Sequence, residues 1–423
     1  MKVLVIPPEE FVPPQAPLSA IFQYHQAMAV RSRGLSVAVI SVTPSVALKP
    51  MIISFVRRLL GRRTFYNPVR GLGGLGIAKL LWKTLWSRSE WKWEEMDGLQ
   101  VVRVRLPCWS DMGPEAELAY YESCVRYGYR ILLGRFGRPD ILHVHNSWLA
   151  GTSVLALSKE EGLPYCLTEH STFFSRGLIP ERFHPLLRSV YASSACNLVV
   201  SPSLGRMLQA MGLLPRGYRV LPNVLDPLFE GAGLQAAPAE GPFTFLHVAE
   251  LTAKKGQANL LRAFSAAFAG DGKARLVIGG EGDLSEELRR LSEALGISDK
   301  VSFTGRLDRS AVLDWMQACH VFVLPSLVET FGVVVIEAHA CGRPVVATIC
   351  GGPEDIITEE NGMLVPAGDV DALAEALRSA KRRWSGYEPS VIRETALHRY
   401  GSKILAHSLT SLYQEMRGTV LRS

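Results

Sequence analysis

The sequence has few features of secreted, membrane-spanning or fibrous proteins. No apolar run approaches the ~20 residues that a membrane span needs. The apolar run after Met1 is too short for a secretory signal and predicts a first strand over Val3–Ile6 instead. The seven cysteines are scattered without a C-x-x-C pair, which favours reduced thiols in a cytoplasmic protein. The 423 residues, 48% hydrophobic and 20% charged, are typical of two or three globular domains, which excludes collagen, coiled coils and wholesale disorder.

Acidic residues are also scarce in one segment. Between Met51 and Trp93 the chain has nine basic residues and a single acid, Glu90, which gives a net charge of +8. The whole chain carries +6, so the remainder is slightly acidic. A local excess of this kind predicts an anionic partner for that segment rather than a generally basic surface.

Short β-branched runs alternate with helical patterns along both halves of the chain. In the first half, a helix is expected over 18–34 and further strands over 37–42, 101–106, 141–145, 165–168 and 198–201. A linker rich in Gly, Ala and Pro follows at Gly231–Pro242. In the second half, helices are expected over 284–295 and 309–318, and strands over 243–249, 275–278, 301–304, 320–324 and 344–348. The alternation predicts two α/β domains with parallel sheets, over residues 1–228 and 243–399.

The segment 51–93 interrupts the first alternation as an insertion. A helix over Ile77–Trp86 would be amphipathic, with Lys79 and Lys83 beginning its polar side. Four of the eight tryptophans lie between residues 82 and 93. Basic amphipathic helices with interfacial tryptophans bind membrane surfaces, so the insertion predicts docking on anionic lipid. The alternative is a helix packed on its own domain with a solvated basic edge.

The most informative segment is Val321–Ala338. A strand is expected to end at Pro325, and a helix to begin near Gly332 after a short loop. The free amide groups and the positive dipole end of that helix suit a phosphate. Glu329 and Glu337 are poor phosphate ligands, but their carboxylates can accept hydrogen bonds from sugar and ribose hydroxyl groups.

This segment resembles the Glu-x7-Glu signature of retaining glycosyltransferases with the GT-B fold, especially those of family 4. Seven further segments resemble motifs of the same family in the same order: Asp140–Asn146, Thr168–Ser171, Pro222–Asp226, His247–Gly256, Gly279–Gly282, Phe303–Arg306 and Cys341–Val346. The resemblance implies two Rossmann-like domains that face a cleft. The C-terminal helix, within residues 400–423, would cross back to the first domain, with hinges near 225–242 and 399–401.

The resemblance also implies roles for individual residues. Lys255 would bind the donor diphosphate, and Glu337 would hold the ribose hydroxyl groups. The two catalytic residues would be Glu329, which holds the transferred sugar, and His170, which contacts the sugar ring from the other domain. The further donor-binding groups implied are the Arg306 side chain and the backbone amides of Phe331, Gly332, Val333 and Val334.

The reaction implied is the transfer of a sugar, with retention, from a nucleoside diphosphate sugar to a glycan or lipid-linked glycan. A UDP-sugar is the first expectation for the donor, ahead of GDP- and ADP-sugars. Cell-surface polysaccharide or glycolipid biosynthesis would use such an enzyme in the cytoplasm, with peripheral attachment to the inner face of the membrane. We expect no cofactor, no metal site and no nucleic-acid partner.

Two departures from the family pattern leave alternatives open. Glu250 stands where the family usually has an arginine beside the later lysine, and Gln15–Leu18 stands where a Gly-Gly pair is usual. An acid near a diphosphate would be repulsive unless Lys254 or Arg306 compensates. A non-catalytic donor-binding subunit is therefore one alternative, and a GT-B enzyme that epimerises or hydrolyses a nucleotide sugar is another.

Three weaker motifs have structural interpretations. His143 and His145 face the same side of a strand, where packing or hydrogen bonding is expected rather than a metal pair. The Gly71–Gly76 segment matches G-x-G-x-x-G but follows no strand, which predicts a flexible loop. Asp369-Val-Asp371 opens a helix, so capping is the expected role.

Overall fold

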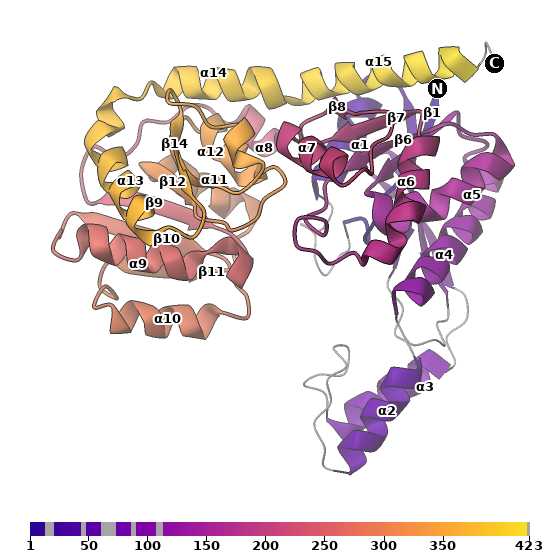
Figure 1. Ribbon diagram of the computed structural model, residues 1–423, viewed down its shortest axis with the longest axis horizontal. Helices are drawn as coiled ribbons and strands as arrows, with labels where there is room; N and C mark the ends of the chain where they lie inside the picture. The colour runs from indigo at the N-terminus through magenta and orange to yellow at the C-terminus, as the bar shows by residue number, and fades with distance from the viewer. Residues whose placement is uncertain (13–20, 44–47, 61–72, 86–89, 107–112, 421–423) are drawn as a thin grey trace.

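The structure is a computed structural model that describes residues 1–12, 21–43, 48–60, 73–85, 90–106 and 113–420. Two sheets form two α/β bodies, and a pair of helices runs along the same side of both (Figure 1). In the part of the chain that the structure describes, no helix is both long and apolar enough to cross a bilayer. No disulfide joins the cysteines within those ranges, and Cys108 lies outside them.

Within the described ranges, the N-terminal sheet has eight strands in the order β3-β4-β2-β1-β5-β6-β7-β8. All neighbours pair in parallel except β3 and β4. The strands are β1 (Lys2–Ile6), β2 (Ser36–Val42), β3 (Glu90–Met96), β4 (Leu99–Arg105), β5 (Ile141–His145), β6 (Tyr165–Glu169), β7 (Cys196–Val199) and β8 (Arg219–Val220).

Helices cover both faces of this sheet because successive strand residues point to opposite sides. Val3 and Val5 of β1 pack in one core with α1 (Ile21–Arg31) and α15 (Ser402–Val420). Leu4 and Ile6 pack in a second core on the other face. The helices on that face are α4 (Pro114–Arg135), α5 (Thr152–Glu161), α6 (His184–Ser193) and α7 (Pro202–Ala210).

The described part of the C-terminal sheet has six parallel strands in the order β11-β10-β9-β12-β13-β14. The strands are β9 (Phe243–Val248), β10 (Ala274–Gly279), β11 (Val301–Gly305), β12 (Val321–Leu324), β13 (Val345–Ile349) and β14 (Gly362–Pro366). One face packs on α9 (Gln257–Phe268), α10 (Ser285–Ala294) and α13 (Val370–Arg383). The other packs on α8 (Pro227–Gly231), α11 (Arg309–Ala318), α12 (Val333–Ala340) and α14 (Pro389–Tyr400).

The C-terminal helices join the two bodies, as the resemblance implied. Helix α14 lies on the C-terminal sheet, and α15 continues from it onto the N-terminal sheet (Figure 1). Leu409 and Tyr413 of α15 are buried in the N-terminal core. The chain passes between the two domains near Leu225 and again near Tyr400. The Leu225 amide donates a 2.8 Å hydrogen bond to the Tyr400 carbonyl, so these two connecting segments contact each other. Two parallel-sheet domains with a crossing C-terminal helix are the GT-B architecture that the sequence predicts.

The insertion differs in part from its prediction. Helices α2 (Leu48–Leu59) and α3 (Gly74–Leu85) pack together as a hairpin that extends away from the N-terminal body (Figure 1). Gly74 and Gly76 lie in α3, so the flexible-loop prediction is wrong for these two residues, while Gly71 lies outside the described residues. Trp86 and residues 15–18 also lie outside them.

Two of the four tryptophans assigned to the basic insertion lie instead in the N-terminal sheet. Trp91 and Trp93 lie on the antiparallel edge strand β3, and the Arg135 guanidinium carbon is 5.3 Å from each ring centroid. Asp97 and Gly98 both have positive φ in the turn that joins β3 to β4. An Asp-Gly pair between two alternating segments is a hairpin signal, and it could have identified β3 from the sequence.

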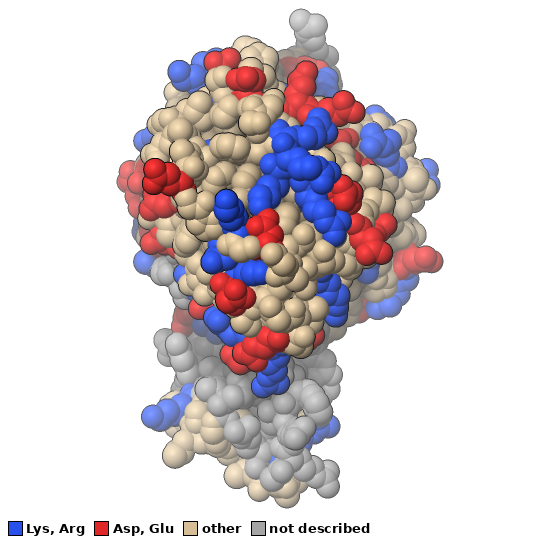
Figure 2. Space-filling model, turned by 90° about the vertical axis from the view of Figure 1, so that its left-hand side faces the viewer, with Lys and Arg blue, Asp and Glu red and all other residues tan. Residues whose placement is uncertain are grey.

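Basic side chains are not confined to the insertion. Seen from the end of the molecule formed by the C-terminal body, Lys and Arg gather in a band with Asp and Glu beside it (Figure 2). On this body, α13 has Lys381 and Arg382 in its last turn, and both pair with acids: Asp271 with Lys381 and Glu375 with Arg382. Neighbouring acids therefore offset much of the basic charge here, in contrast to segment 51–93.

Candidate active site

The loop between β12 and α12 leads into a helix whose first amide groups have no acceptor within the helix. Gly332 is the N-cap of α12 and has a φ of 95°, which disfavours any residue with a Cβ. The first amide groups of a helix have no acceptor within it, so those of Val333 and Val334 are available to an anion. The Phe331 ring is buried and lies against that of Tyr400, with 5.7 Å between centroids. The helix begins where the sequence predicts.

Lys255 and Glu329 meet at the carboxyl end of the C-terminal sheet. Lys255 ends a short turn after β9, and its Nζ lies 2.5 Å from Oε1 of Glu329. The Ser326 hydroxyl donates a 2.9 Å hydrogen bond to the same oxygen. Gly256 has a φ of 70°, and a Cβ there would lie 2.0 Å from the Pro325 carbonyl oxygen. Glycine at position 256 therefore allows the turn that contains Lys255 to lie against the loop that contains Glu329.

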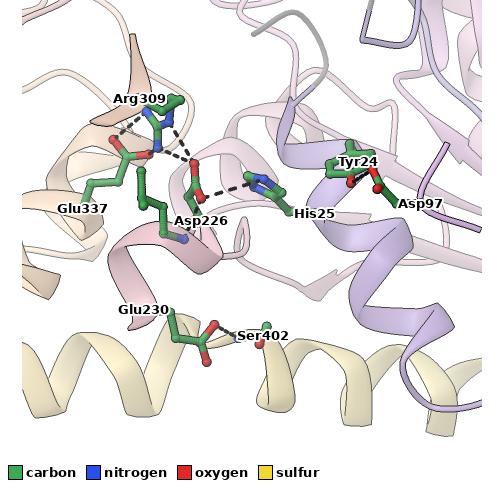
Figure 3. A network of polar contacts seen from close by, with 9 residues as sticks. Tyr24, His25, Asp97, Asp226, Glu230, Arg309, Glu337 and Ser402 are labelled. Atoms are coloured by element: carbon green, nitrogen blue, oxygen red, sulfur yellow. Dashed lines mark hydrogen bonds and ion pairs between the residues drawn. The ribbon is translucent and has the colours of Figure 1, made fainter. Parts of the chain in front are cut away.

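Glu337 lies on α12 and is almost fully buried, at 2% exposure. Arg309, the first residue of α11, donates to it from Nη2 at 2.5 Å and from Nη1 at 3.4 Å. The Nε of Arg309 donates to Oδ2 of Asp226 at 2.8 Å. Figure 3 shows the guanidinium group between the two carboxylates. Burial raises the pKa of Glu337, and the charge of Arg309 opposes that rise.

This network reaches the N-terminal domain through a histidine. His25 of α1 places Nε2 3.8 Å from Oδ1 of Asp226 (Figure 3). Burial lowers the pKa of His25, while the carboxylate of Asp226 opposes that effect. Asp226 also caps α8, because its Oδ1 accepts a 2.9 Å hydrogen bond from the Leu228 amide.

His170 follows β6 and lies at the contact between the two domains. Its backbone carbonyl accepts a 2.7 Å hydrogen bond from the hydroxyl of Thr330, the residue after Glu329. Its Nε2 lies 2.9 Å from Nδ1 of His145, and its ring lies 4.8 Å from that of Phe22 between centroids. Burial lowers the pKa of His170 to about 3, so the ring is neutral at physiological pH.

Two family profiles match the chain. Residues 235–394 match the profile described as "Glycosyl transferases group 1", and residues 87–227 match "Glycosyltransferase Family 4". The phosphatidyl-myo-inositol mannosyltransferase of Mycobacterium leprae is 30% identical over 292 residues, which are 66% of this chain and 74% of that protein. The chain belongs to the group 1 glycosyltransferases.

Other relatives match more locally or in fold alone. A GDP-mannose-dependent mannosyltransferase of Corynebacterium glutamicum is 37% identical over 134 residues, which are 30% of this chain and 35% of its own length. Sucrose-phosphate synthase of Thermosynechococcus elongatus has a TM-score of 0.73 at 19% identity, with 99% of this chain and all of that chain covered. HepE of Anabaena, solved with UDP, has a TM-score of 0.67 at 17% identity, covering 98% of this chain and all of that one. These two structures support the GT-B fold.

The structure of this glycosyltransferase does not gather every predicted donor-binding group. Lys255, Glu329 and His170 follow β9, β12 and β6, where Lys255 contacts Glu329 and Thr330 contacts His170. The α12 terminus follows Glu329 along the chain, and Glu337 lies in the second turn of that helix. The side chains of Arg306 and Glu250 are exposed beyond the ends of β11 and β9. The predicted role of Arg306 therefore stays a prediction.

Two of the three weaker motifs, the His143–His145 pair and Asp369, have the structural roles expected of them. His143 hydrogen-bonds through Nδ1 to the Tyr413 hydroxyl at 2.6 Å and through Nε2 to the Thr168 hydroxyl at 2.8 Å. Asp369 caps α13 by accepting a 2.9 Å hydrogen bond from the Ala372 amide. Among the described residues, no group of three or more His, Cys, Asp or Glu side chains has an arrangement that could hold a metal ion.

Sequence reasoning missed Arg309 and Thr330. Arg309 offers one signal, because an arginine in the first turn of a helix lies at the positive end of the dipole, where a cation is unfavourable. A cation in that position suggests a nearby anion that offsets the cost, and the structure supplies two. Thr330 offers none, because its contact with His170 depends on how the domains meet.

Proposed function

We propose that this glycosyltransferase moves a sugar from a nucleoside diphosphate sugar, with a UDP-sugar as the first expectation, to a glycan or lipid-linked glycan acceptor. The acceptor would belong to cell-surface polysaccharide or glycolipid biosynthesis. The observation that carries the proposal is the convergence of Lys255, Glu329 and the α12 terminus beside His170. HepE, which has the same fold, was solved with UDP, and a relative is named for phosphatidyl-myo-inositol.

Each group has a chemical task in this proposal. Lys255 and the amides of the α12 terminus bind the diphosphate, because a cation and a helix N-terminus both stabilise negative charge. Glu337 accepts hydrogen bonds from the ribose hydroxyl groups, and Glu329 accepts them from the transferred sugar. His170, being neutral, contacts the sugar ring as a hydrogen-bonding group rather than as a proton donor. Arg306 contacts the donor near the base.

The transfer retains the anomeric configuration. The bond from the anomeric carbon to the phosphate oxygen breaks, and the acceptor oxygen bonds to that carbon on the same face. The departing phosphate oxygen takes the acceptor's proton. Fixed charges and amide dipoles stabilise the leaving diphosphate, which is the usual origin of large rate enhancements. We propose that this reaction needs no cofactor and no metal ion, and full activity in EDTA is the expected result.

Product analysis tests the reaction. Incubation with a UDP-sugar and a lipid-linked glycan should give nucleotide release that depends on the acceptor, and NMR of the product should show retention. Nucleotide release at the full rate without an acceptor would instead indicate hydrolysis or epimerisation. Donor binding without turnover would indicate a non-catalytic subunit. Loss of all activity in EDTA would contradict metal independence.

The α2–α3 hairpin is proposed to dock the acceptor domain on an anionic cytoplasmic leaflet. Large apolar side chains are exposed on it, with Leu59 at 68%, Leu60 at 65% and Leu75 at 82%. Arg57 and Lys79 are exposed on the same two helices. The sequence has no acidic residue between Glu10 and Glu90, so nothing in this segment repels anionic headgroups. Burial of leucines together with attraction of basic residues to phosphates is the usual basis of peripheral binding.

Vesicle sedimentation tests the docking. The wild-type protein should sediment with phosphatidylglycerol vesicles and much less with phosphatidylcholine vesicles. Replacement of Leu59, Leu60 and Leu75 by Ser should abolish sedimentation, whereas Val391→Ser, at an exposed valine of α14, serves as the matched control. Equal sedimentation of the triple variant and the wild-type protein would reject this surface.

A further inference from the structure

Arg309 holds both carboxylate oxygens of Glu337. Its Nη2 donates to Oε1 at 2.5 Å and its Nη1 to Oε2 at 3.4 Å. A carboxylate offers about four acceptor positions, and Arg309 uses about one on each oxygen. The arginine therefore fixes the direction of the carboxylate without using all of its hydrogen-bonding capacity.

Arg309 is itself held on two further sides. Oδ2 of Asp226 accepts from its Nε at 2.8 Å, and the guanidinium carbon lies 4.7 Å from the centroid of the Phe229 ring. Asp226 precedes α8, Arg309 begins α11 and Glu337 belongs to α12, so the contacts join three separate elements. A planar guanidinium group that is pinned in this way has little freedom to leave the carboxylate.

We propose that Arg309 is the positioning residue for the donor ribose, holding Glu337 in the orientation and charge state that accept hydrogen bonds from the two ribose hydroxyl groups. Asp226 supports this role by fixing the arginine from its other side. The inference rests on the proposed nucleotide-sugar donor, and it assigns recognition of the ribose to a pair of residues rather than to Glu337 alone.

The charge state of Glu337 depends on its neighbours. Burial raises its pKa, Arg309 opposes the rise, and the carboxylate of Asp226 adds to it. Cys341, one turn along α12, is neutral, because burial raises the pKa of its thiol to about 12. His25 faces the pair through Asp226. Without Arg309, both remaining influences favour the protonated carboxyl group, which would accept fewer hydrogen bonds from ribose.

Binding of UDP and 2′-deoxy-UDP by calorimetry tests the proposal. The wild-type protein should bind UDP at least about tenfold more tightly than 2′-deoxy-UDP, because the hydroxyl group forms a charge-assisted hydrogen bond with a carboxylate. Arg309→Leu should weaken UDP binding and reduce that ratio toward one. Its affinity for UDP should rise more steeply with pH than that of the wild-type protein, because ionisation of Glu337 adds to that of the phosphate. Arg309→Lys keeps a charge and should restore the wild-type pH profile with part of the affinity.

Controls separate this role from a structural one. Arg290→Leu, at an exposed arginine of α10, should leave both affinities and the ratio unchanged. Arg309→Leu leaves the carboxylate of Asp226 without its cation and could unfold the protein for that reason. In that case the double variant Asp226→Asn, Arg309→Leu, which removes both charges, is tested in its place. The proposal would be overturned if Arg309→Leu kept the wild-type ratio of UDP to 2′-deoxy-UDP affinity, or if it bound UDP more tightly than the wild-type protein. If the wild-type protein binds neither UDP nor GDP nor ADP, the proposed donor class fails instead.

Discussion

The Thr330 hydroxyl donates a 2.7 Å hydrogen bond to the backbone carbonyl of His170, 160 residues away on the other domain. The Thr330 carbonyl in turn accepts a 2.7 Å hydrogen bond from the hydroxyl of Ser201, which also belongs to the N-terminal domain. Because Glu329 directly precedes Thr330, these two bonds set the spacing between Glu329 and His170.

Replacement of Thr330 by Val should therefore affect catalysis more than stability. Loss of one hydrogen bond costs about 1 kcal/mol of unfolding free energy. Misplacement of Glu329 relative to His170 should lower kcat by about tenfold or more, because small displacements at a reacting centre are costly. Steady-state kinetics and urea unfolding measure the two effects. A variant with full kcat would show that this contact does not set the catalytic spacing.

Lys255 should be essential for the donor diphosphate. Lys255→Ala should lower kcat/KM by about a hundredfold or more, since the lysine stabilises charge that grows on the leaving group. Lys273→Ala is the matched control, because Lys273 is exposed at the amino end of β10, opposite the edge that carries the site. Equal kinetic losses in the two variants would contradict the proposed role of Lys255.

Glu250 should weaken the affinity for the donor. It lies two residues after β9, at the edge where the diphosphate is proposed to bind, and its side chain is exposed. Glu250→Arg replaces a repulsive charge with an attractive one and should tighten UDP binding severalfold, measured by calorimetry at low salt. Unchanged affinity would mean that the side chain faces away from the phosphates.

The buried histidines should make the fold sensitive to acid. Burial lowers the pKa of His143 and of His170 to about 3 in the folded protein, below an ordinary value of 6.5. The unfolded chain therefore binds more protons below pH 6.5, and stability that is fully present above this pH falls as pH decreases toward 3. Each such histidine contributes a slope of about 1.4 kcal/mol per pH unit.

Urea unfolding at pH 7, 6 and 5 measures this slope. His143→Gln should reduce the slope by about one histidine's share, about 1.4 kcal/mol per pH unit. His398→Gln, at an exposed histidine of α14, serves as the control. Identical slopes in the wild-type protein and His143→Gln would contradict the assignment of His143 as neutral and buried.

The sequence predicted correctly those helices and strands that are marked by residues next to one another in the chain. β5 and α11 begin and end where their patterns indicate, because apolar runs and an Asp308 cap mark them. The start of α12 after Gly332 was also predictable, since glycine is favoured where φ is positive. β3 was missed because its charged, tryptophan-containing sequence was grouped with the basic insertion.

The site was predictable only where family motifs mark it. Lys255, Glu329 and Glu337 lie in recognisable segments, and the structure brings the first two together. The Arg309 contact with Glu337 required knowledge of the sheet order. β11 is an edge strand and β12 is three positions away, so α11 must return across the sheet to reach α12. Such a contact depends on tertiary packing, which spacing along the chain does not encode.

Calorimetry with a panel of UDP-, GDP- and ADP-sugars, on the wild-type protein and on Glu337→Ala, tests the central claim most directly. The account predicts selective binding of one donor, weakened by about tenfold or more in Glu337→Ala, since a charge-assisted hydrogen bond to the ribose is lost. Absence of binding by every donor, or equal affinity of the two proteins, would contradict a nucleotide-sugar site at α12.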